Sequence, residues 1–285
     1  MENVLIVTNF NAGRKKALKY KKQVSKFVLE HDGRFKFADI DELQSINFSE
    51  FDTIFVMGGD GSVNKALPYL VNSEKTLGII PCGTANLLAA KLGISLNIKK
   101  ALKTISEGNV KKIDIINVND NICGLRCGFG YDSDIICKTP QSLKNRFGYF
   151  AYFIAGILFA LRLKNKHYRI KIDGKDFEKE ASCLIFANSA NMYRNIVSLA
   201  DNSLPDDGQI DIFMLKTTNP VVLYLELVNI FLGIRRNNSR AEYLTGQSIE
   251  IENNWQVCHI DGEKKNLKDN INISIINKAV KIYSK

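Results

Sequence analysis

A glycine-rich run directly after an apolar segment limits what this chain can fold into more than any other feature of the sequence. Gly58–Ser62 reads GGDGS, follows the apolar stretch Thr53–Met57 and precedes a helix-like segment that begins at Val63. A buried strand, a glycine turn and a helix start together bind phosphate, because backbone N–H groups approach an anion closely and the helix dipole adds positive charge. Asp60 places a carboxylate inside this turn, which suits the handling of a magnesium ion or a proton. The alternative is an ordinary strand–helix turn in which Asp60 caps the helix.

The first part of the chain alternates strands and helices. Apolar, β-rich runs at Val4–Thr8, Thr53–Met57 and Leu77–Ile80 are separated by stretches with helical spacing of apolar residues. Pro68 lies near the end of the helix that follows the glycine turn, so that helix is expected to be short or kinked. This order predicts a doubly wound α/β domain with a mostly parallel sheet. Ligands bind at the carboxyl ends of such strands, which is where three turns would lie: 9–13, 58–62 and 81–84.

From about Asp114 onward the segments become shorter and richer in β-forming residues, which predicts an antiparallel sandwich or barrel. We therefore expect two domains, over residues 1–115 and 116–276. Whether the C-terminal tail, about 277–285, returns to the first domain is left open. The candidate strands of the second region are 113–118, 168–172, 182–187, 210–215, 249–252, 257–260 and 271–276.

Two apolar segments, 147–161 and 221–232, interrupt the β-rich region and carry basic residues at their ends. Basic ends beside an aromatic, apolar body fit helices that lie at a membrane interface. Two core helices with solvated basic ends would give the same pattern. The chain has no run of about 20 apolar residues, so we expect no transmembrane helix. The N-terminus has neither the basic start nor the apolar length of a signal peptide, so we expect a cytoplasmic protein.

The charge of the chain indicates an anionic partner, since 39 Lys and Arg against 30 Asp and Glu give a net charge of +9. No helix-turn-helix or aromatic-rich RNA-binding signature accompanies this charge, so we expect peripheral attachment to an anionic membrane surface and no nucleic acid. A generally basic protein without such a partner is the alternative. The six cysteines form no CxxC pair, which argues against zinc and for free thiols in a reducing compartment.

A second turn supports the phosphate-binding interpretation of the first. Pro81–Asn86 (PCGTAN) would lie at the same sheet edge and offer the Thr84 hydroxyl and the Asn86 amide. GGDGS followed by PCGTAN resembles the catalytic domain shared by diacylglycerol kinases, sphingosine kinases and bacterial YegS-type lipid kinases. This resemblance covers nearly the whole chain. It implies a nucleotide-binding α/β domain followed by a β-rich lipid-binding domain, with the active site in the cleft between them. Four further segments match the family pattern in order: 9–13, 128–132, 204–211 and 259–263.

The resemblance implies ATP as co-substrate and Mg²⁺ as cofactor, and it assigns residues to both. A structural magnesium would be held by the carboxylate of Asp207, with Leu204 and Gln209 as carbonyl donors, a set of hard oxygen ligands. The residues by themselves favour an Asp-Gly turn before a strand. Phe10 stands where the family usually has proline. The ATP phosphates would lie against Asn9, Phe10, Asn11, Ala12, Gly13, Gly58, Gly59, Asp60, Gly61, Ser62, Val63, Asn64 and Thr84.

The late segment His259–Glu263 supplies the candidates for a general base. Phosphorylation of an alcohol needs a carboxylate near the hydroxyl, and the family pattern favours Glu263 as the proton acceptor. Asp261 and Asp60 would support it or a catalytic magnesium. Alternation along a strand would point Asp261 and Glu263 to the same side. The alternative is a hairpin turn with two solvated acids.

The expected activity is therefore an ATP-dependent lipid kinase that phosphorylates diacylglycerol or a related membrane lipid at the inner face of the membrane. Family members are often homodimers. Two other functions fit parts of the sequence: an NAD kinase, which shares the GGDG turn, and a non-catalytic protein that binds nucleotide or lipid on the same fold. The apolar segments with basic ends argue against an NAD kinase. The retained acids Asp60, Asp207, Asp261 and Glu263 argue against loss of catalysis.

Overall fold

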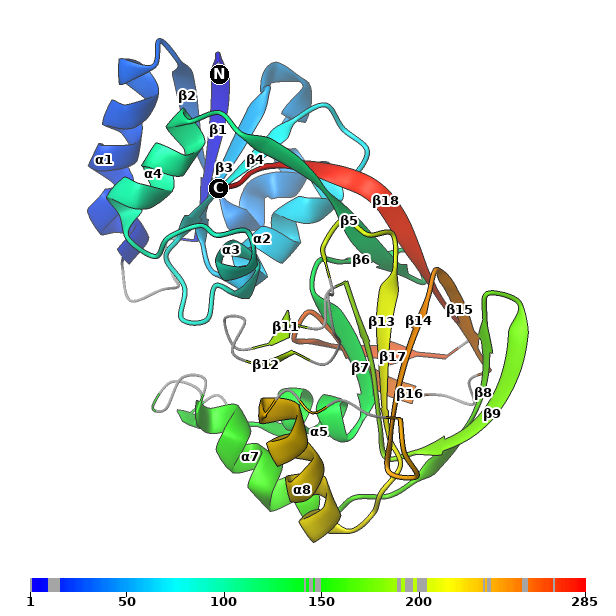
Figure 1. The fold of residues 1–285 in the computed structure, drawn as a ribbon. Coiled ribbons are helices and arrows are strands. Elements are labelled where there is room, and N and C mark those ends of the chain that lie inside the picture. Colours follow the sequence, from blue (N-terminus) through cyan, green and yellow to red (C-terminus); the bar gives the residue numbers. More distant parts are fainter. Residues whose placement is uncertain are drawn as a thin grey trace. The chain divides into compact units, whose positions relative to one another are not determined.

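The computed structural model of the 285-residue chain divides into two compact units, Met1–Asp114 with Asn277–Lys285, and Ile115–Ile276 (Figure 1). Each unit is treated by itself. The structure describes residues 2–9, 16–140, 142–143, 146, 150–188, 191–192, 197–198, 204–232, 234, 237–252, 256–268 and 270–285.

The first unit is built on a parallel sheet in the order β2-β1-β3-β4-β18. The four N-terminal strands are β1 (Asn3–Thr8), β2 (Arg34–Asp39), β3 (Thr53–Gly58) and β4 (Thr76–Pro81). The fifth is the end of the long strand β18 (Ile271–Tyr283), which pairs with β4. The helices are α1 (Lys16–Glu30), α2 (Asp60–Ala66), α3 (Leu87–Lys91) and α4 (Ile98–Ser106), with 3₁₀ turns at Ile40–Ser45, Phe48–Glu50 and Leu67–Tyr69.

Both faces of this sheet are buried, as a doubly wound sheet requires. Val4 and Ile6 of β1 pack in one cluster with residues of α1 and α4, while Leu5 and Val7, which point the other way, are also fully buried. The expected α/β class is therefore confirmed. Helix α2 ends at Ala66 and continues as a 3₁₀ turn that contains Pro68, as the proline predicts.

The second unit contains two sheets with a common apolar core. The six-stranded antiparallel sheet has the order β14-β13-β10-β7-β16-β17: Ala241–Gly246, Ile210–Leu215, Cys183–Ala187, Arg126–Gly130, Gln256–Ile260 and Glu263–Leu267. The other sheet joins β9 (Lys175–Ala181), β8 (Lys166–Ile172), β15 (Ser248–Ile251) and the start of β18, with β5 (Val110–Val118) and β6 (Asn121–Cys123) beside β18. A short pair, β11 (Asn191–Met192) and β12 (Val197–Ser198), stands apart.

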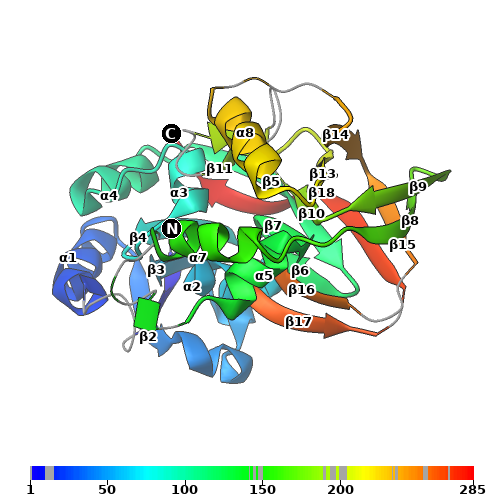
Figure 2. The same ribbon diagram turned by 90° about the horizontal axis from the view of Figure 1, so that it is seen from below.

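The six-stranded sheet buries side chains on both faces. Leu184 and Phe186 of β10 join the core between the sheets, whereas Cys183 and Ile185 face a second apolar cluster. Helices α5 (Tyr131–Lys138), α7 (Phe150–Ala160) and α8 (Pro220–Phe231) supply residues to that cluster or lie against the sheet. Figure 2 shows α5 beside β16 and β17. The predicted sandwich is thus present, with a helical layer on one face.

Candidate active site

The glycine turn after β3 meets the turn after β4 backbone against backbone. A Cβ added to Gly83 would lie 2.4 Å from the Cα of Gly59, closer than any real Cβ contact. The Cys82 N–H donates to the Gly58 carbonyl at 2.8 Å, so the two strands remain paired up to the turns. A Cβ on Gly58 would overlap the Ser62 side chain at 2.4 Å. These glycines are therefore required by the packing of the two turns.

Asn86 holds the second turn in shape. Its backbone lies in the left-handed region at φ 50°, and its side chain is buried. Its Oδ1 accepts the Gly83 N–H at 3.0 Å and its Nδ2 donates to the Gly83 carbonyl at 2.9 Å. The Asn86 amide is thus paired with the backbone of its own turn. This corrects the expectation that the amide is available to a ligand at the sheet edge. Thr84, in contrast, is exposed.

Asp60 links the two turns. It is the first residue of α2, which Gly59 precedes as N-cap without a side-chain bond. The Asp60 Oδ1 accepts the N–H of Leu88, near the start of α3, at 3.2 Å. Asp60 therefore contacts the start of α3, whereas a cap of its own helix was the alternative drawn from the sequence.

The remaining residues expected at the phosphates differ in their surroundings. Ser62 and Val63 are buried, Asn9 and Asn64 are half-buried and Gly61 is exposed. Both side-chain polar atoms of Asn64 are buried without a hydrogen-bond partner among the described residues. Buried polar groups without partners are rare in native proteins and often mark a ligand or water site. Phe10, Asn11, Ala12 and Gly13 lie outside the described residues.

The Asp-Gly-Glu segment forms the turn of a hairpin between β16 and β17. Asp261 and Gly262 are the two turn residues, with φ values of 49° and 90°, and Glu263 is the first residue of β17. Positive φ at both positions is what a two-residue hairpin turn requires. Asp261 and Glu263 are therefore not alternating residues of one strand, and the expectation that they point to the same side on that ground was wrong. Glu263 is exposed.

Asp261 is held by the backbone of residues 124–126. Its carboxylate accepts the N–H groups of Gly124, Leu125 and Arg126 at 2.6, 2.9 and 3.0 Å. Its own N–H donates to the Arg126 carbonyl at 2.9 Å. Burial raises the pKa of Asp261, and the hydrogen bonds from these N–H groups offset only part of that rise. The hairpin turn is thus fixed to the start of β7, and Asp261 is not a solvated acid.

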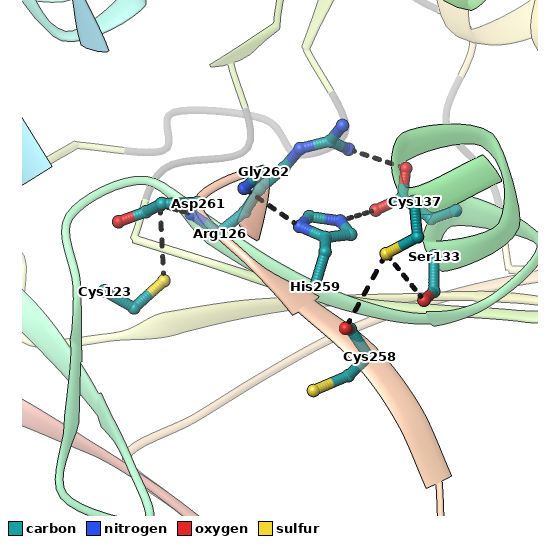
Figure 3. Close-up of polar contacts among 9 residues, drawn as sticks. Cys123, Arg126, Ser133, Cys137, Cys258, His259, Asp261 and Gly262 are labelled. Atoms are coloured by element: carbon teal, nitrogen blue, oxygen red, sulfur yellow. Dashed lines mark hydrogen bonds and ion pairs between the residues drawn. The ribbon is translucent and has the colours of Figure 1, made fainter. Parts of the chain in front are cut away.

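A buried charged network lies next to this turn (Figure 3). Asp132, near the start of α5, pairs through one oxygen with the Arg126 guanidinium at 3.1 Å and through the other with His259 Nε2 at 2.5 Å. Burial alone would raise the pKa of Asp132, but the Arg126 guanidinium and the hydrogen bond from His259 lower it to about 2. The Gly262 N–H donates to His259 Nδ1 at 3.3 Å. No sequence pattern indicated this network, because Asp132 and His259 lie 127 positions apart.

The segment expected to hold a structural magnesium is a compact loop before β13. The Asp207 carboxylate accepts the N–H groups of Leu204 at 3.1 Å and Gln209 at 3.0 Å, so the three residues are brought together. Each carboxylate oxygen retains a lone pair, and the donor set consists of hard oxygens, which fits magnesium. Among the described residues, no three His, Cys, Asp or Glu side chains cluster as a metal site.

The strand register relates this loop to the hairpin. Asp211 of β13 lies opposite Ala187 of β10, and Ala187 lies opposite Arg126 of β7. Ile260 of β16 lies opposite Cys127, so Asp261 follows next to Arg126. The loop 204–209 and the Asp261-Gly262 turn therefore lie at the same end of the strands of this sheet. Three strand spacings, about 14 Å, separate β13 from β16.

Comparison with known proteins agrees with this architecture. Residues 3–118 match the model of the diacylglycerol kinase catalytic domain, and residues 126–283 match that of the YegS C-terminal NAD kinase beta sandwich-like domain. The chain is 30% identical over 218 residues to a diacylglycerol kinase of Bacillus subtilis, which covers 75% of this chain and 72% of the relative. It is 33% identical over 215 residues to an uncharacterized protein of Synechocystis and spans 50% of that relative's length.

Solved structures show the same fold. A candidate diacylglycerol kinase from Bacillus anthracis superposes with a TM-score of 0.83 at 24% identity, over 100% of this chain and 95% of that one. Another diacylglycerol kinase structure from the same organism gives a TM-score of 0.74 at 22% identity, over 100% and 97%.

Together with the match to the diacylglycerol kinase catalytic domain, the parallel α/β unit with its two interlocked glycine turns and the β-sandwich identify an ATP-dependent lipid kinase. The chain belongs to the diacylglycerol kinase family, as its motifs predict. An NAD kinase is not favoured, because the first 118 residues match the diacylglycerol kinase catalytic domain.

Proposed function

We propose that this lipid kinase transfers the γ-phosphate of ATP to the free hydroxyl of diacylglycerol or a closely related membrane lipid. The similarity of the chain to diacylglycerol kinases of Bacillus subtilis and Staphylococcus aureus supports this acceptor class. The observation that carries the proposal is the pair of turns at Gly59 and Gly83, whose backbones touch with no space for a side chain. The Gly83, Ser62 and Val63 N–H groups already have partners within the turns. The phosphate oxygens would therefore approach the backbone at the exposed Gly61, where no atom lies within 4 Å of the missing side chain.

The phosphates of ATP would lie against the turn Gly58–Ser62, with Asn9 to Gly13 and the exposed Thr84 hydroxyl beside them. Val63 is in the core and would contribute only its backbone. The Asn64 amide, buried without a partner among the described residues, would gain one in the nucleotide. Asp60 would supply the carboxylate on the nucleotide side.

Glu263 would accept the proton of the lipid hydroxyl as the oxygen attacks the γ-phosphorus. Its exposure leaves the carboxylate accessible to a substrate, and its position directly after the hairpin turn is fixed through its neighbours. Asp261 would be a positioning residue, because both of its carboxylate oxygens already accept backbone N–H groups. The carboxylate that takes the proton must lie within hydrogen-bond reach of the hydroxyl.

Magnesium would neutralise phosphate charge in the reaction, and a second ion would be held by Asp207 with the carbonyls of Leu204 and Gln209. The bonds from Leu204 and Gln209 to Asp207 already close that loop. Removal of magnesium by EDTA should therefore abolish transfer, and differential scanning calorimetry should show a lower Tm if the loop binds the ion.

Glu263→Gln tests the assignment of the base. The amide cannot accept the proton, so kcat should fall at least 1,000-fold while the Kd for ATP stays within twofold. Glu180→Gln, an exposed acid on β9, is the matched control and should leave both unchanged. The substrate is dioleoylglycerol in phosphatidylglycerol vesicles with radiolabelled ATP. An unchanged kcat in Glu263→Gln would remove Glu263 from this role.

We also propose that α8 and the end of α7 lie on an anionic membrane. None of the helices in the described ranges has the length and apolar composition to cross a bilayer. On α8 the exposed side chains recur at helical spacing as an apolar stripe, with Val221, Leu225 and Val228 each at least half exposed. Exposed basic residues follow α7 at Arg162, Lys164 and Lys166. An exposed apolar stripe with basic flanks is typical of helices at a membrane interface.

Vesicle flotation tests the membrane surface. The double variant Leu225→Asn, Val228→Asn should bind phosphatidylglycerol vesicles at least tenfold more weakly, because each apolar side chain contributes roughly 1–2 kcal/mol on leaving water. Leu29→Asn, at an equally exposed leucine on α1, is the control and should bind like the unchanged protein. Equal binding of the double variant would contradict this surface. A homodimer, also implied by the family, is tested by light scattering.

A further inference from the structure

We infer that His259 is a positioning residue for Glu263, through the hydrogen bond that it accepts from the backbone of Gly262. The inference rests on the proposed role of Glu263 as the base. The structure gives His259 no contact with substrate-accessible space, since it is only 1% exposed. Its effect on catalysis would therefore act through the turn that carries Glu263.

The two contacts of the imidazole define its tautomer. A backbone N–H can only donate, so His259 Nδ1 must accept the Gly262 N–H and carries no proton. The proton of the neutral ring then lies on Nε2 and is donated to Asp132. A carboxylate on one ring nitrogen is the usual means of fixing the tautomer of the other. Figure 3 shows the ring between Gly262 and the carboxylate.

Asp132 is itself held in place. The Arg126 guanidinium binds its other oxygen at 3.1 Å. Gly128 of β7 lies directly against the pair, since a Cβ there would lie 2.2 Å from Asp132 Oδ2 and 2.7 Å from His259 Nε2. The chain Arg126–Asp132–His259 is thus packed on the strand and presents one fixed acceptor to the turn.

The turn is held differently at its two residues. Asp261 is fixed by its carboxylate and its own N–H to residues 124–126. Gly262 has φ 90° and open space where a Cβ would be, so no side chain packs on this side of the turn. Glu263 pairs with Ile260 across the hairpin, and the bond to His259 adds a side-chain contact at Gly262, the residue directly before Glu263. A catalytic group displaced by about 1 Å can lose about 100-fold in rate.

Two substitutions of His259 separate the two ring contacts. In His259→Asn the side-chain oxygen takes the place of Nδ1 and still accepts the Gly262 N–H, but the contact with Asp132 is lost. In His259→Gln the side-chain NH₂ takes the place of Nε2 and still donates to Asp132, but the acceptor for Gly262 is lost. We expect kcat to fall at least tenfold further in His259→Gln than in His259→Asn, with the KM for ATP unchanged in both.

The assay is the transfer of labelled phosphate to dioleoylglycerol in vesicles, with Tm measured for each variant. Ile249→Val removes a buried methyl from β15, in the other sheet of the same unit, and should lower Tm without lowering kcat. Equal kcat in the two His259 variants, or a kcat that simply follows Tm, would overturn the inference. Should either variant fail to fold, the imidazole ¹⁵N spectrum of the unchanged protein decides, because a protonated Nδ1 at neutral pH is incompatible with an acceptor for Gly262.

A double variant separates this inference from the proposed base. If His259 acts through Glu263, His259→Gln should lower kcat no further in a Glu263→Gln background, and an additional tenfold loss would overturn the inference alone. If Glu263→Gln by itself retains the full rate, the proposed base is wrong and the inference is lost with it.

Discussion

The turn after β3 and the hairpin turn after β16 each place an aspartate next to a buried strand, but they hold it in different ways. In the first unit, Asp60 accepts the Leu88 N–H at 3.2 Å and the turn is shaped by glycine packing against Gly83. In the second unit, the carboxylate of Asp261 accepts three backbone N–H groups within 3.0 Å. One turn is defined by the absence of side chains, and the other by one side chain with many partners.

This difference shows how an acid in a motif should be interpreted. Asp261 has both oxygens bound to the backbone, so its first effect is on the position of residues 124–126 and of the turn. Glu263, two residues later, is exposed and retains a carboxylate that a substrate can reach. The number of partners of each acid, which the sequence does not contain, separates a positioning role from a proposed catalytic one.

The largest effect should come from Gly83→Ala. The new methyl would lie 2.4 Å from the Gly59 Cα and 2.9 Å from Asn86 Oδ1, and because the nearest atom is backbone, the two turns must move apart. We expect a loss of about 3 kcal/mol or more in unfolding free energy, measured by urea titration, and at least tenfold weaker ATP binding by calorimetry. Normal stability together with normal ATP binding would show that the turns are not interlocked.

Asp261→Asn should have the next largest effect. The amide oxygen can replace the oxygen that serves Leu125 and Arg126, but the NH₂ group would then face the Gly124 N–H. A buried donor against a donor costs about 2–3 kcal/mol. In Asp60→Asn the amide oxygen can still accept the Leu88 N–H, so the loss should be smaller, about 1 kcal/mol. Equal losses of unfolding free energy in Asp261→Asn and Asp60→Asn, measured by urea titration, would show that the two turns hold their aspartates equally strongly.

Sequence patterns identified the strands that lie inside the sheets and missed those at the edges. Thr53–Met57 was predicted and is part of β3, and Ile210–Leu215 corresponds to β13. The strands β2, β9, β14 and β17, which the sequence did not indicate, are the outermost strands of their sheets. An edge strand buries fewer of its side chains and tolerates charged residues, as in Glu263–Leu267 (EKKNL). The apolar pattern that predicts a strand is therefore weak there. β7 was missed for another reason, since two of its five residues are glycine.

The candidate site was predictable to a similar degree. Gly58–Ser62 and Pro81–Asn86 are local sequence patterns. The contact between the two turns follows from the parallel pairing of β3 with β4. The Arg126–Asp132–His259 network depends on the pairing of β7 with β16 and on α5, and no spacing in the sequence encodes these contacts. The roles assigned to Asp60, Asp207 and Glu263 remain predictions.

The acid stability of the protein should reveal the network in the second unit. The pKa of Asp132 is lowered from its ordinary value of 3.8 to about 2. A lowered pKa stabilises the folded state above the unfolded value, so this contribution is present above about pH 4 and is lost as pH falls toward 2. The loss should be about 2 kcal/mol, and Asp132→Asn should remove this part of the pH dependence. Asp134→Asn is the control, because this half-exposed acid on the same helix pairs only at the surface with Lys138, and it should change the curve far less.

Gly61→Ala should have the smallest effect on the fold. It separates the need for glycine in turn packing from the need for glycine where a phosphate approaches the backbone. No atom lies within 4 Å of the position that its Cβ would take, and Gly61 lies inside α2. Alanine is the better helix former, so urea unfolding should show a gain of up to about 1 kcal/mol. If Gly61 is glycine because phosphate approaches the backbone, the methyl group should nevertheless weaken ATP binding about three- to tenfold. Unchanged ATP affinity in Gly61→Ala would show that no phosphate approaches the backbone at this position, because the methyl group would then occupy space that no ligand needs.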